Sequence, residues 1–251
     1  MSGTDRQLTT VRRAFEILEL LWENGSLGVT ELAERLDTHK STVHGYLRTL
    51  ESTGFVVNED GRYRLSLRFL EIGGRIKHRS RLFHVTHPQL ERLAADTGHA
   101  ASLAVEENGE MVIVHLADSD RSLQLGIYAG MHVPIHSNAS GKAVLAHDAE
   151  LAADCLAGEL AAVTEHTKTD PNAVAAELDE VRERGYAYDW DEQVVGMGLV
   201  AAPVLVDEEA LGAVAVVCAT NELRGADQRE RLAERVQQAA NVIAVNYQYG
   251  R

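Results

Sequence analysis

A polar surface at residues 38–48 carries side chains that can read the edges of DNA base pairs. Val43 and Leu47 lie four residues apart and predict the buried side of a helix. The opposite side offers short hydroxyls and long cations, the groups that bind bases and phosphates when a helix enters the major groove. We therefore predict DNA contacts from Thr38, His39, Lys40, Ser41, Thr42, His44, Gly45 and Arg48.

Gly45 is an unusual residue for the middle of such a helix. Glycine costs about 1 kcal/mol relative to alanine in a helix interior. One explanation is that the backbone approaches DNA closely at this position, and the other is neutral drift at an exposed site. The sequence leaves both open.

The elements around this helix follow the order of a winged helix-turn-helix. We predict a first helix over Thr10–Trp22, with a core face made of Val11, Phe15, Leu18 and Trp22. A second helix is predicted over Glu31–Leu36 with Thr30 as its N-cap, and a third from Lys40 to about Gly54 with Thr38 as its cap.

A hairpin completes the module. Two apolar segments flank residues 58–62, and the Asp60-Gly61 pair is typical of a tight hairpin turn. This hairpin is the predicted wing, in which Arg62 or Arg64 can reach a phosphate or the minor groove. After it, residues 68–81 predict a linker helix whose pattern is broken at Gly73-Gly74.

The net charge of −14 is divided unevenly between the two parts of the chain. Residues 1–81 carry 13 Lys and Arg and 11 Asp and Glu, whereas residues 82–251 carry 11 and 27. The locally basic part is therefore the predicted DNA module. The acidic excess, together with only four lysines, also suits a salt-rich cytoplasm such as that of a halophilic archaeon.

Neither a membrane span nor a cysteine-based site is indicated. No apolar run approaches the roughly 18 residues that a membrane span needs. Cys155 and Cys218 are the only cysteines, without the spacing of a thiolate zinc site. We expect a cytoplasmic protein with no cofactor and no metal.

From Leu82 onward the pattern changes to mixed α/β. Apolar runs around Asn108-Gly109 predict a hairpin. Together with later segments they predict a curved antiparallel sheet flanked by helices. The predicted strands are 102–105, 111–116, 123–128, 186–190, 198–205 and 211–219, and the predicted helices are 85–96, 141–146, 171–183 and 228–247.

The segment PIHSNASGKA, residues 134–143, predicts a strand, a polar turn and a helix start capped by Ser140 and Gly141. Free N–H groups at a helix start favour a carboxylate or a phosphate. From this segment alone, the favoured interpretation is that Ser140 caps the helix and binds nothing.

Several ordered motifs resemble the IclR family of transcriptional regulators over nearly the whole chain. They include LTTVRRAFEILELL, ELAERLDTHKSTVHGYLRTLESTGFV, PIHSNASGKAVLA, GYAYDWDEQVVGMGLVAAPV and LGAVAVV. The resemblance implies an α+β protein in which a winged helix-turn-helix (1–67) and a linker helix (68–81) precede an effector-binding domain similar to GAF and PAS sensors (82–251). It also implies homodimers through the DNA-binding half, paired into homotetramers, on palindromic operators in double-stranded DNA.

The resemblance also implies an effector pocket, whose residues can be assigned by their positions in the matching motifs. Its floor falls on Ser140 and Gly141, and its acidic residue on Asp189. Two positions that often bear hydroxyls in the family fall on Val216 and Cys218, which implies a more apolar pocket and a larger sugar-derived or aromatic acid rather than a very small one. Leu199 and Met131 complete the expected ligand-binding set.

Two other functions remain open at this point. A hydrolytic site would use Asp189, His136, Ser137 and Ser140, but no nucleophile elbow, P-loop or HExxH motif supports it. A metal-responsive regulator of the same fold would hold zinc with His132 and His136 plus Asp189 or Cys218.

Overall fold

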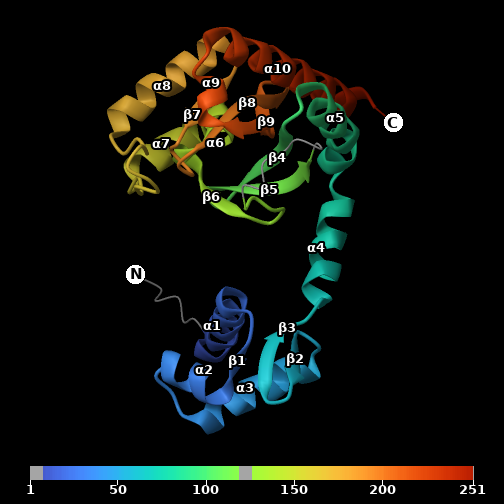
Figure 1. The fold of residues 1–251 in the computed structure, drawn as a ribbon, viewed down its shortest axis with the longest axis vertical. Helices are drawn as coiled ribbons and strands as arrows, with labels where there is room; N and C mark the ends of the chain where they lie inside the picture. The colour runs from blue at the N-terminus through green and yellow to red at the C-terminus, as the bar shows by residue number, and fades with distance from the viewer. Residues whose placement is uncertain (1–7, 119–125, 251) are drawn as a thin grey trace, which may run out of the picture. The chain divides into compact units, whose positions relative to one another are not determined.

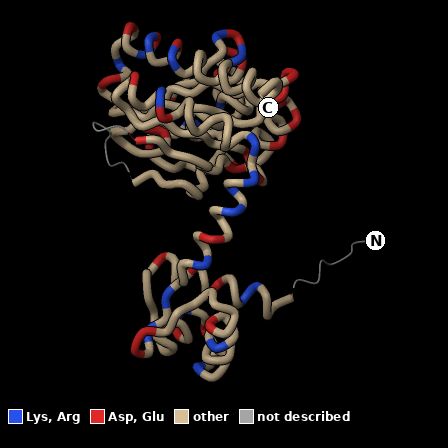
Figure 2. The backbone as a smooth tube through the Cα atoms, turned by 90° about the vertical axis from the view of Figure 1, so that its right-hand side faces the viewer, with Lys and Arg blue, Asp and Glu red and all other residues tan. Residues whose placement is uncertain are grey.

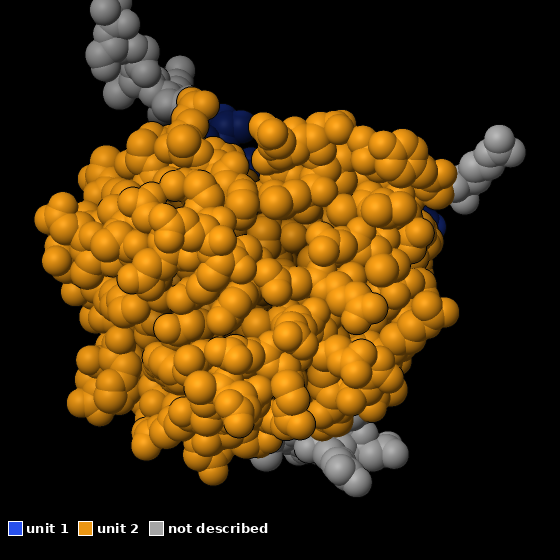
Figure 3. Space-filling model, turned by 90° about the horizontal axis from the view of Figure 1, so that it is seen from above, with its two compact units in different colours: residues 1–77 blue, residues 78–251 orange. Residues whose placement is uncertain are grey.

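The computed structural model describes residues 8–118 and 126–250, which form two compact units, residues 1–77 and 78–251 (Figures 1 and 3). Unit 1 holds a three-helix module and a small sheet, and unit 2 holds a six-stranded sheet between helices. The architecture is α+β, as the sequence predicts. No helix of the described residues combines the length and apolar character needed to cross a membrane.

Unit 1 begins with α1 (Thr9–Asn24), α2 (Val29–Arg35) and α3 (Lys40–Ser52). The strands β1 (Leu27–Gly28), β2 (Val56–Glu59) and β3 (Arg62–Leu65) form an antiparallel sheet in the order β1-β3-β2. At the tip of the β2–β3 hairpin, Asp60 and Gly61 have φ values of 53° and 85°. These left-handed conformations are those of the primed turns that join twisted strands. The wing therefore forms where the Asp-Gly pair predicts it.

Of the predicted core face of α1, only Leu18 packs against the core of unit 1. Val11, Phe15 and Trp22 are 50%, 59% and 63% exposed, whereas Ile17 and Leu21 are buried. Both sets recur at helical spacing, so the periodicity gave two apolar stripes and no means of ranking them. The exposed stripe is a candidate surface for self-association.

Two predicted caps of unit 1 are also wrong. The N-cap of α2 is Gly28 rather than Thr30, and the Gly28 N–H donates to the Glu31 carboxylate at 2.8 Å. His39 rather than Thr38 is the N-cap of α3, and its side chain makes no capping hydrogen bond. In each case the helix boundary lies one or two residues from the hydroxyl that suggested the cap.

The helix α4 (Arg68–Arg79) lies within the segment 68–81 that the sequence predicts as a linker helix, and it continues through Gly73 and Gly74. A Cβ atom added at either glycine would meet nothing within 4 Å. The next helix, α5 (Arg81–Thr97), starts after Ser80, whose side chain accepts a hydrogen bond from the Phe83 N–H.

Unit 2 is built on an antiparallel sheet of order β6-β5-β4-β9-β8-β7. Its strands are β4 (Ala100–Glu107), β5 (Glu110–Ala117), β6 (His132–Pro134), β7 (Ala187–Trp190), β8 (Met197–Val206) and β9 (Glu209–Ala219). Of the predicted strand 123–128, residues 123–125 lie outside the described part of the chain, and residues 126–128 are not in a strand.

Helices cover both faces of this sheet. One face packs on α5 and α10 (Ala226–Tyr249), and the other on α6 (Ala139–Leu145) and α8 (Pro171–Arg184). A 3₁₀ turn (Ile135–Ser137), α7 (Ala149–Ala157) and α9 (Thr220–Leu223) complete the unit. The sequence predicted neither α7 nor α9, whereas the strand and polar turn predicted within residues 134–143 correspond to β6, which ends at Pro134, and to the 3₁₀ turn.

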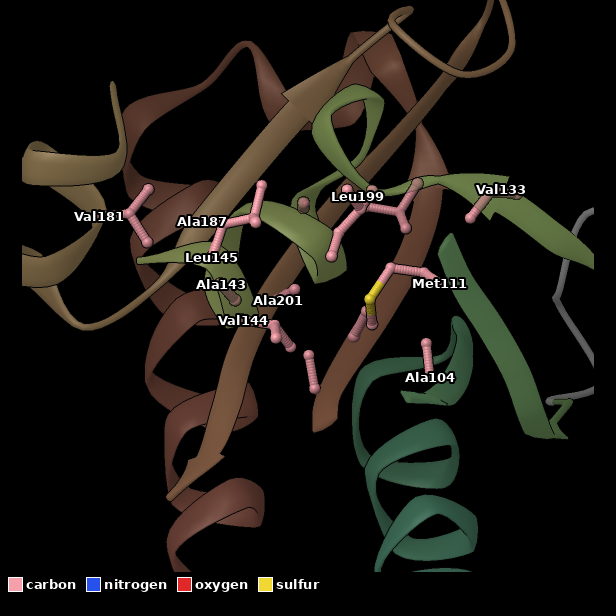
Figure 4. Packing of buried hydrophobic residues seen from close by; sticks show 14 of the residues in the cluster. Ala104, Met111, Val133, Ala143, Val144, Leu145, Val181, Ala187, Leu199 and Ala201 are labelled. Atoms are coloured by element: carbon pink, nitrogen blue, oxygen red, sulfur yellow. The ribbon is translucent and has the colours of Figure 1, made fainter. Parts of the chain in front are cut away.

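The layer between α6 and the sheet is an apolar core. Figure 4 shows Ala143, Val144 and Leu145 of α6 among side chains of the sheet. Gly141 lets the first turn of α6 pack closely on the preceding 3₁₀ turn, because a Cβ atom there would lie 1.8 Å from the Ile135 carbonyl oxygen. The start of α6 lies at the edge of an internal cavity, which Asn138 and Ser140 line.

Candidate functional site

The exposed side of α3 presents the polar residues that the sequence predicts. Val43 and Leu47 are fully buried in unit 1, and the side chains on the opposite face reach solvent. No carboxylate occurs in α3 before Glu51. The half of the helix that would enter a groove is therefore cationic and polar, although residues 1–77 as a whole are neutral. The exposed residues are His39, Lys40, Ser41, Thr42, His44, Gly45 and Arg48, with Thr38 half-buried.

Nothing inside the chain requires a glycine at position 45. A Cβ atom there would meet no other atom within 4 Å, and the backbone is helical. The Gly45 carbonyl oxygen accepts a hydrogen bond from Thr49 Oγ1 at 2.9 Å. The absence of an internal reason leaves the same two explanations, close approach to DNA or drift.

Arg62 of the wing is held by its own domain. Its guanidinium donates to Glu31 at 3.0 Å, to the Ser26 carbonyl oxygen at 2.7 Å and to the Ser26 hydroxyl at 3.2 Å. The Arg62 contacts tie the wing to α2 and to Ser26, the residue before β1, so a phosphate contact from Arg62 would have to replace them. Arg64 is bound within the wing itself, by Glu59.

Figure 2 marks the positively and negatively charged residues along the described chain.

Unit 2 contains a cavity of about 40 Å³ between the sheet and the start of α6. Its wall is mostly apolar, with polar side chains where α6 and the loop after β7 meet. The lining residues are Ser102, Ala104, Ile113, Ile127, Met131, Val133, Asn138, Ser140, Gln193, Val194, Met197, Leu199 and Val217.

The first turn of α6 is fixed by two side chains. Asn138, rather than Ser140 or Gly141, is the N-cap, and its Oδ1 accepts from the Gly141 N–H at 3.0 Å. Asp189 Oδ2 accepts from the Ala139 N–H at 2.7 Å. Two backbone donors that the sequence suggested for a ligand are therefore used inside the protein.

A buried ionic cluster lies behind this turn. Lys142 Nζ, which is fully buried, lies 2.5 Å from Glu192 and 2.9 Å from Glu177. Lys168 adds a second cation 3.0 Å from Glu177. Burial alone lowers the pKa of Lys142, but the two carboxylates outweigh it and raise the pKa above its ordinary value, so the ammonium stays charged.

This cluster positions one wall of the cavity. Glu192 directly precedes Gln193, and Ser137 Oγ donates to Gln193 Oε1 at 2.7 Å. In this arrangement the amide NH₂ group of Gln193 is the part left to donate to a bound molecule. Nothing in the sequence signals Glu177, Glu192 or Gln193. Lys142, the partner of the two carboxylates, is 35 and 50 residues away along the chain, and Ser137, the partner of Gln193, is 56 residues away.

Models of two protein domains match almost the whole chain. Residues 10–60 match the IclR helix-turn-helix domain, and residues 75–245 match the C-terminal domain of bacterial IclR transcriptional regulators. The chain belongs to the IclR family. Members of this family are DNA-binding transcriptional regulators with a C-terminal effector-binding domain, rather than enzymes.

Individual relatives cover the full length. The probable regulator ArcR of Halobacterium salinarum is 29% identical, with 97% of this chain and 95% of the relative aligned. The crystal structure of the Thermotoga maritima IclR protein is 27% identical with a TM-score of 0.80, over 97% of this chain and all of that one. An IclR homologue of Microbacterium hydrocarbonoxydans, solved with 4-hydroxybenzoate, has a TM-score of 0.79 at 23% identity, over 95% and 98% of the two chains.

Only some of the pocket residues that the family resemblance implied line the cavity in the structure. Met131, Ser140 and Leu199 line the cavity. Gly141 lies in the first turn of α6 but packs against Ile135, and Asp189 lies behind that turn.

Val216 and Cys218 do not line the cavity of this IclR protein. Both belong to the core on the α5 and α10 side of the sheet, whereas Val217 lines the cavity. Alternate residues of a strand face opposite sides of the sheet. A family alignment that is off by one position therefore exchanges the residues that face the cavity with those that face α5 and α10. Burial raises the pKa of the Cys218 thiol to about 12, which fits a neutral core residue.

The residues of the hydrolytic alternative do not converge. His136 Nε2 bonds to the Ala161 carbonyl oxygen, Ser137 to Gln193, and Asp189 to Ala139. The zinc set of the metal-responsive alternative is also dispersed, since His132 is exposed and pairs with Glu110, and Cys218 faces the other side of the sheet.

Asp189 gives the start of α6 a dependence on pH. The carboxyl is fully buried, which raises its pKa from 3.8 to about 7, although the Ala139 N–H and Lys142 oppose the shift. Within the described chain, its Oδ1 has no hydrogen-bond partner. Between these two pKa values the folded state binds more protons than the unfolded state, so this group's contribution to the free energy of unfolding falls as pH rises.

We expect Asp189→Asn, which mimics the protonated acid, to gain stability relative to the wild type as pH rises from 4 to 7. The gain has an upper limit of about 4 kcal/mol, from 1.36 kcal/mol per pKa unit. Urea unfolding of both proteins across this range measures it. A stability difference that stays constant with pH would show that Asp189 is ionised throughout.

Proposed function

We propose that this IclR protein binds an operator through α3 and responds to a small organic acid bound in the cavity of unit 2. The observation that carries the proposal is the cavity itself, a largely apolar space whose lining also includes the hydroxyls of Ser102 and Ser140 and the amides of Asn138 and Gln193. Ligand sites in proteins commonly have this composition, with a few polar groups that fix orientation.

The hydrogen-bond donors that line the cavity favour a ligand that accepts hydrogen bonds. Ser140 and Ser102 supply hydroxyls, and Gln193 supplies an amide NH₂ group. A carboxylate accepts several hydrogen bonds at once and is the simplest acceptor that such a wall would select. The homologue of Microbacterium hydrocarbonoxydans, crystallised with 4-hydroxybenzoate, provides a carboxylic acid as precedent in this fold.

The apolar part of the wall favours an acid with a carbon skeleton, such as a sugar-derived or aromatic acid. Ile113, Val133 and Val217 supply this surface, in place of Val216 and Cys218. A cavity of about 40 Å³ holds only a few atoms, so an acid of this size requires the wall to open. Val194, in the loop after β7, lines the cavity and is 37% exposed, which supports the proposal that the wall opens at this loop.

The cavity assignment is tested by calorimetric titration of a panel of sugar-derived and aromatic acids. We expect one acid to bind, and Gln193→Leu to weaken its binding about tenfold or more, since a hydrogen bond to a charged group is worth about 1.5–3 kcal/mol. Cys218→Ala, a change on the opposite face of the sheet, should leave the affinity unaltered. An acid whose binding depends on Cys218 and not on Gln193 would contradict the assignment.

The α3 surface supports binding to double-stranded DNA through cations and hydroxyls at its N-terminal half. We expect Lys40→Ala and Arg48→Ala each to weaken operator binding and to reduce the dependence of log K on log[salt] by about 1 for each phosphate that the variant no longer neutralises. Fluorescence anisotropy across a salt series measures both. Arg75→Ala removes an equally exposed cation, paired with Glu71 in α4, and serves as the control. Wild-type affinity and slope in both α3 variants would rule out this face.

Self-association through α1 completes the proposed regulator. Val11, Phe15 and Trp22 form an exposed apolar stripe on one helix, which is the kind of surface that mates with a copy of itself in a two-fold dimer. We propose that this stripe forms the homodimer that the family resemblance implies, and that dimers pair into tetramers on palindromic operators.

Phe15→Asp should halve the molar mass in solution, because it places a charge in the middle of the stripe. Light scattering coupled to gel filtration measures the mass, and Glu19→Ala on the same helix is the control. A variant of unchanged mass would place the dimer contact elsewhere.

A further inference from the structure

A second cluster of ligating side chains lies on unit 2, away from the cavity. His87 and Glu91 are one turn apart on α5, and His115 lies on β5, which neighbours α5 (Figure 1). Among the described residues, these are the three that meet as a potential metal-binding group. His115 pairs across the sheet with Leu103, whose side chain lies in the core under α5, so the imidazole faces that helix.

The three ligand atoms are already close to the arrangement that a metal ion needs. His87 Nδ1 lies 2.8 Å from His115 Nε2, and Glu91 Oε1 lies 3.9 Å from each of these nitrogens. One point in the plane of the three atoms lies about 2.1 Å from each of them. This distance equals the length of zinc–nitrogen and zinc–oxygen bonds. In a tetrahedral site neighbouring ligand atoms are about 3.3 Å apart, so each present distance needs to change by about 0.6 Å or less.

The chemistry of the set also matches. The ring nitrogens His87 Nδ1 and His115 Nε2 lie 2.8 Å apart and share a single proton. A metal ion can replace that proton. Two histidines and one carboxylate, with a fourth position left for water, form a common ligand set for zinc. Phe83 stacks on His87 and meets His115 edge-on, with ring centroids 5.7 Å and 5.3 Å away, and so limits the rotation of both rings.

We propose that His87, Glu91 and His115 bind a divalent transition metal ion of the zinc class. The ion would join α5 to β5 on the sheet face opposite the cavity, and its fourth position would be open to solvent, because His87 and Glu91 are half-exposed. The site is independent of the proposed effector and of the residues considered for zinc from the sequence alone.

Full-length protein, freed of metal by chelation, tests the site by zinc titration against a chromophoric chelator. We expect one tight zinc ion per chain, and a loss of affinity of roughly 100-fold or more in His87→Ala, since even supporting residues of metal sites contribute 10–100-fold. Zinc should also raise the unfolding temperature of the wild type, but not of the variant, because only a ligand of the folded state stabilises it.

Two further variants make the result decisive. His132→Ala removes a histidine that is equally exposed and also paired with a carboxylate, Glu110, but lacks a second imidazole, and it should bind zinc like the wild type. Glu91→Gln tests the third ligand without disturbing the more buried His115. Equal zinc affinity and stoichiometry in the wild type and His87→Ala would overturn the proposal.

Discussion

The start of α6 is held by a charge that has no access to water. Lys142 is fully buried and has two carboxylate partners, Glu177 from α8 and Glu192 from the loop after β7. An unpaired ammonium in this position would cost several kcal/mol, so the three elements stay together or the core opens. Two of these elements, α6 and the loop after β7, also line the cavity, through Ser140 and Gln193. The geometry of the proposed ligand site thus depends on an ion cluster whose own residues do not line the cavity.

This arrangement suggests how occupancy of the cavity reaches the rest of unit 2. A ligand that bonds to Gln193 acts on the residue next to Glu192, and therefore on the partner of Lys142. Asp189 adds a group whose pKa of about 7 lies in the range where small shifts in surroundings change its charge. Under the proposed function, the start of α6 would therefore respond both to a bound molecule and to a proton, through contacts of a few residues.

The sequence predicts most elements of this fold, and it fails where the deciding contact is distant. Hairpins at Asp60-Gly61 and Asn108-Gly109 follow from local turn chemistry, and the polar face of α3 follows from the helical spacing of Val43 and Leu47. The buried stripe of α1 could not be chosen, because Ile17 and Phe15 are both apolar and only tertiary packing distinguishes them. The assignment of Val216 and Cys218 to the pocket is wrong for a similar reason, since a strand's facing is set by its register with neighbours. Gln193 and Glu192 were missed because isolated polar residues in a loop carry no signal until their partners are placed.

The central claim is that an acid in unit 2 alters the affinity of unit 1 for DNA. The direct measurement is the dissociation constant for DNA flanking the protein's own gene, by fluorescence anisotropy at fixed salt, with and without the acid selected by titration. The account predicts a change of about 5-fold to 150-fold, the usual range of coupling between two sites, and an equal change in acid affinity when DNA is bound, because such coupling is reciprocal. Specific DNA binding with the same dissociation constant at zero and saturating acid would contradict it.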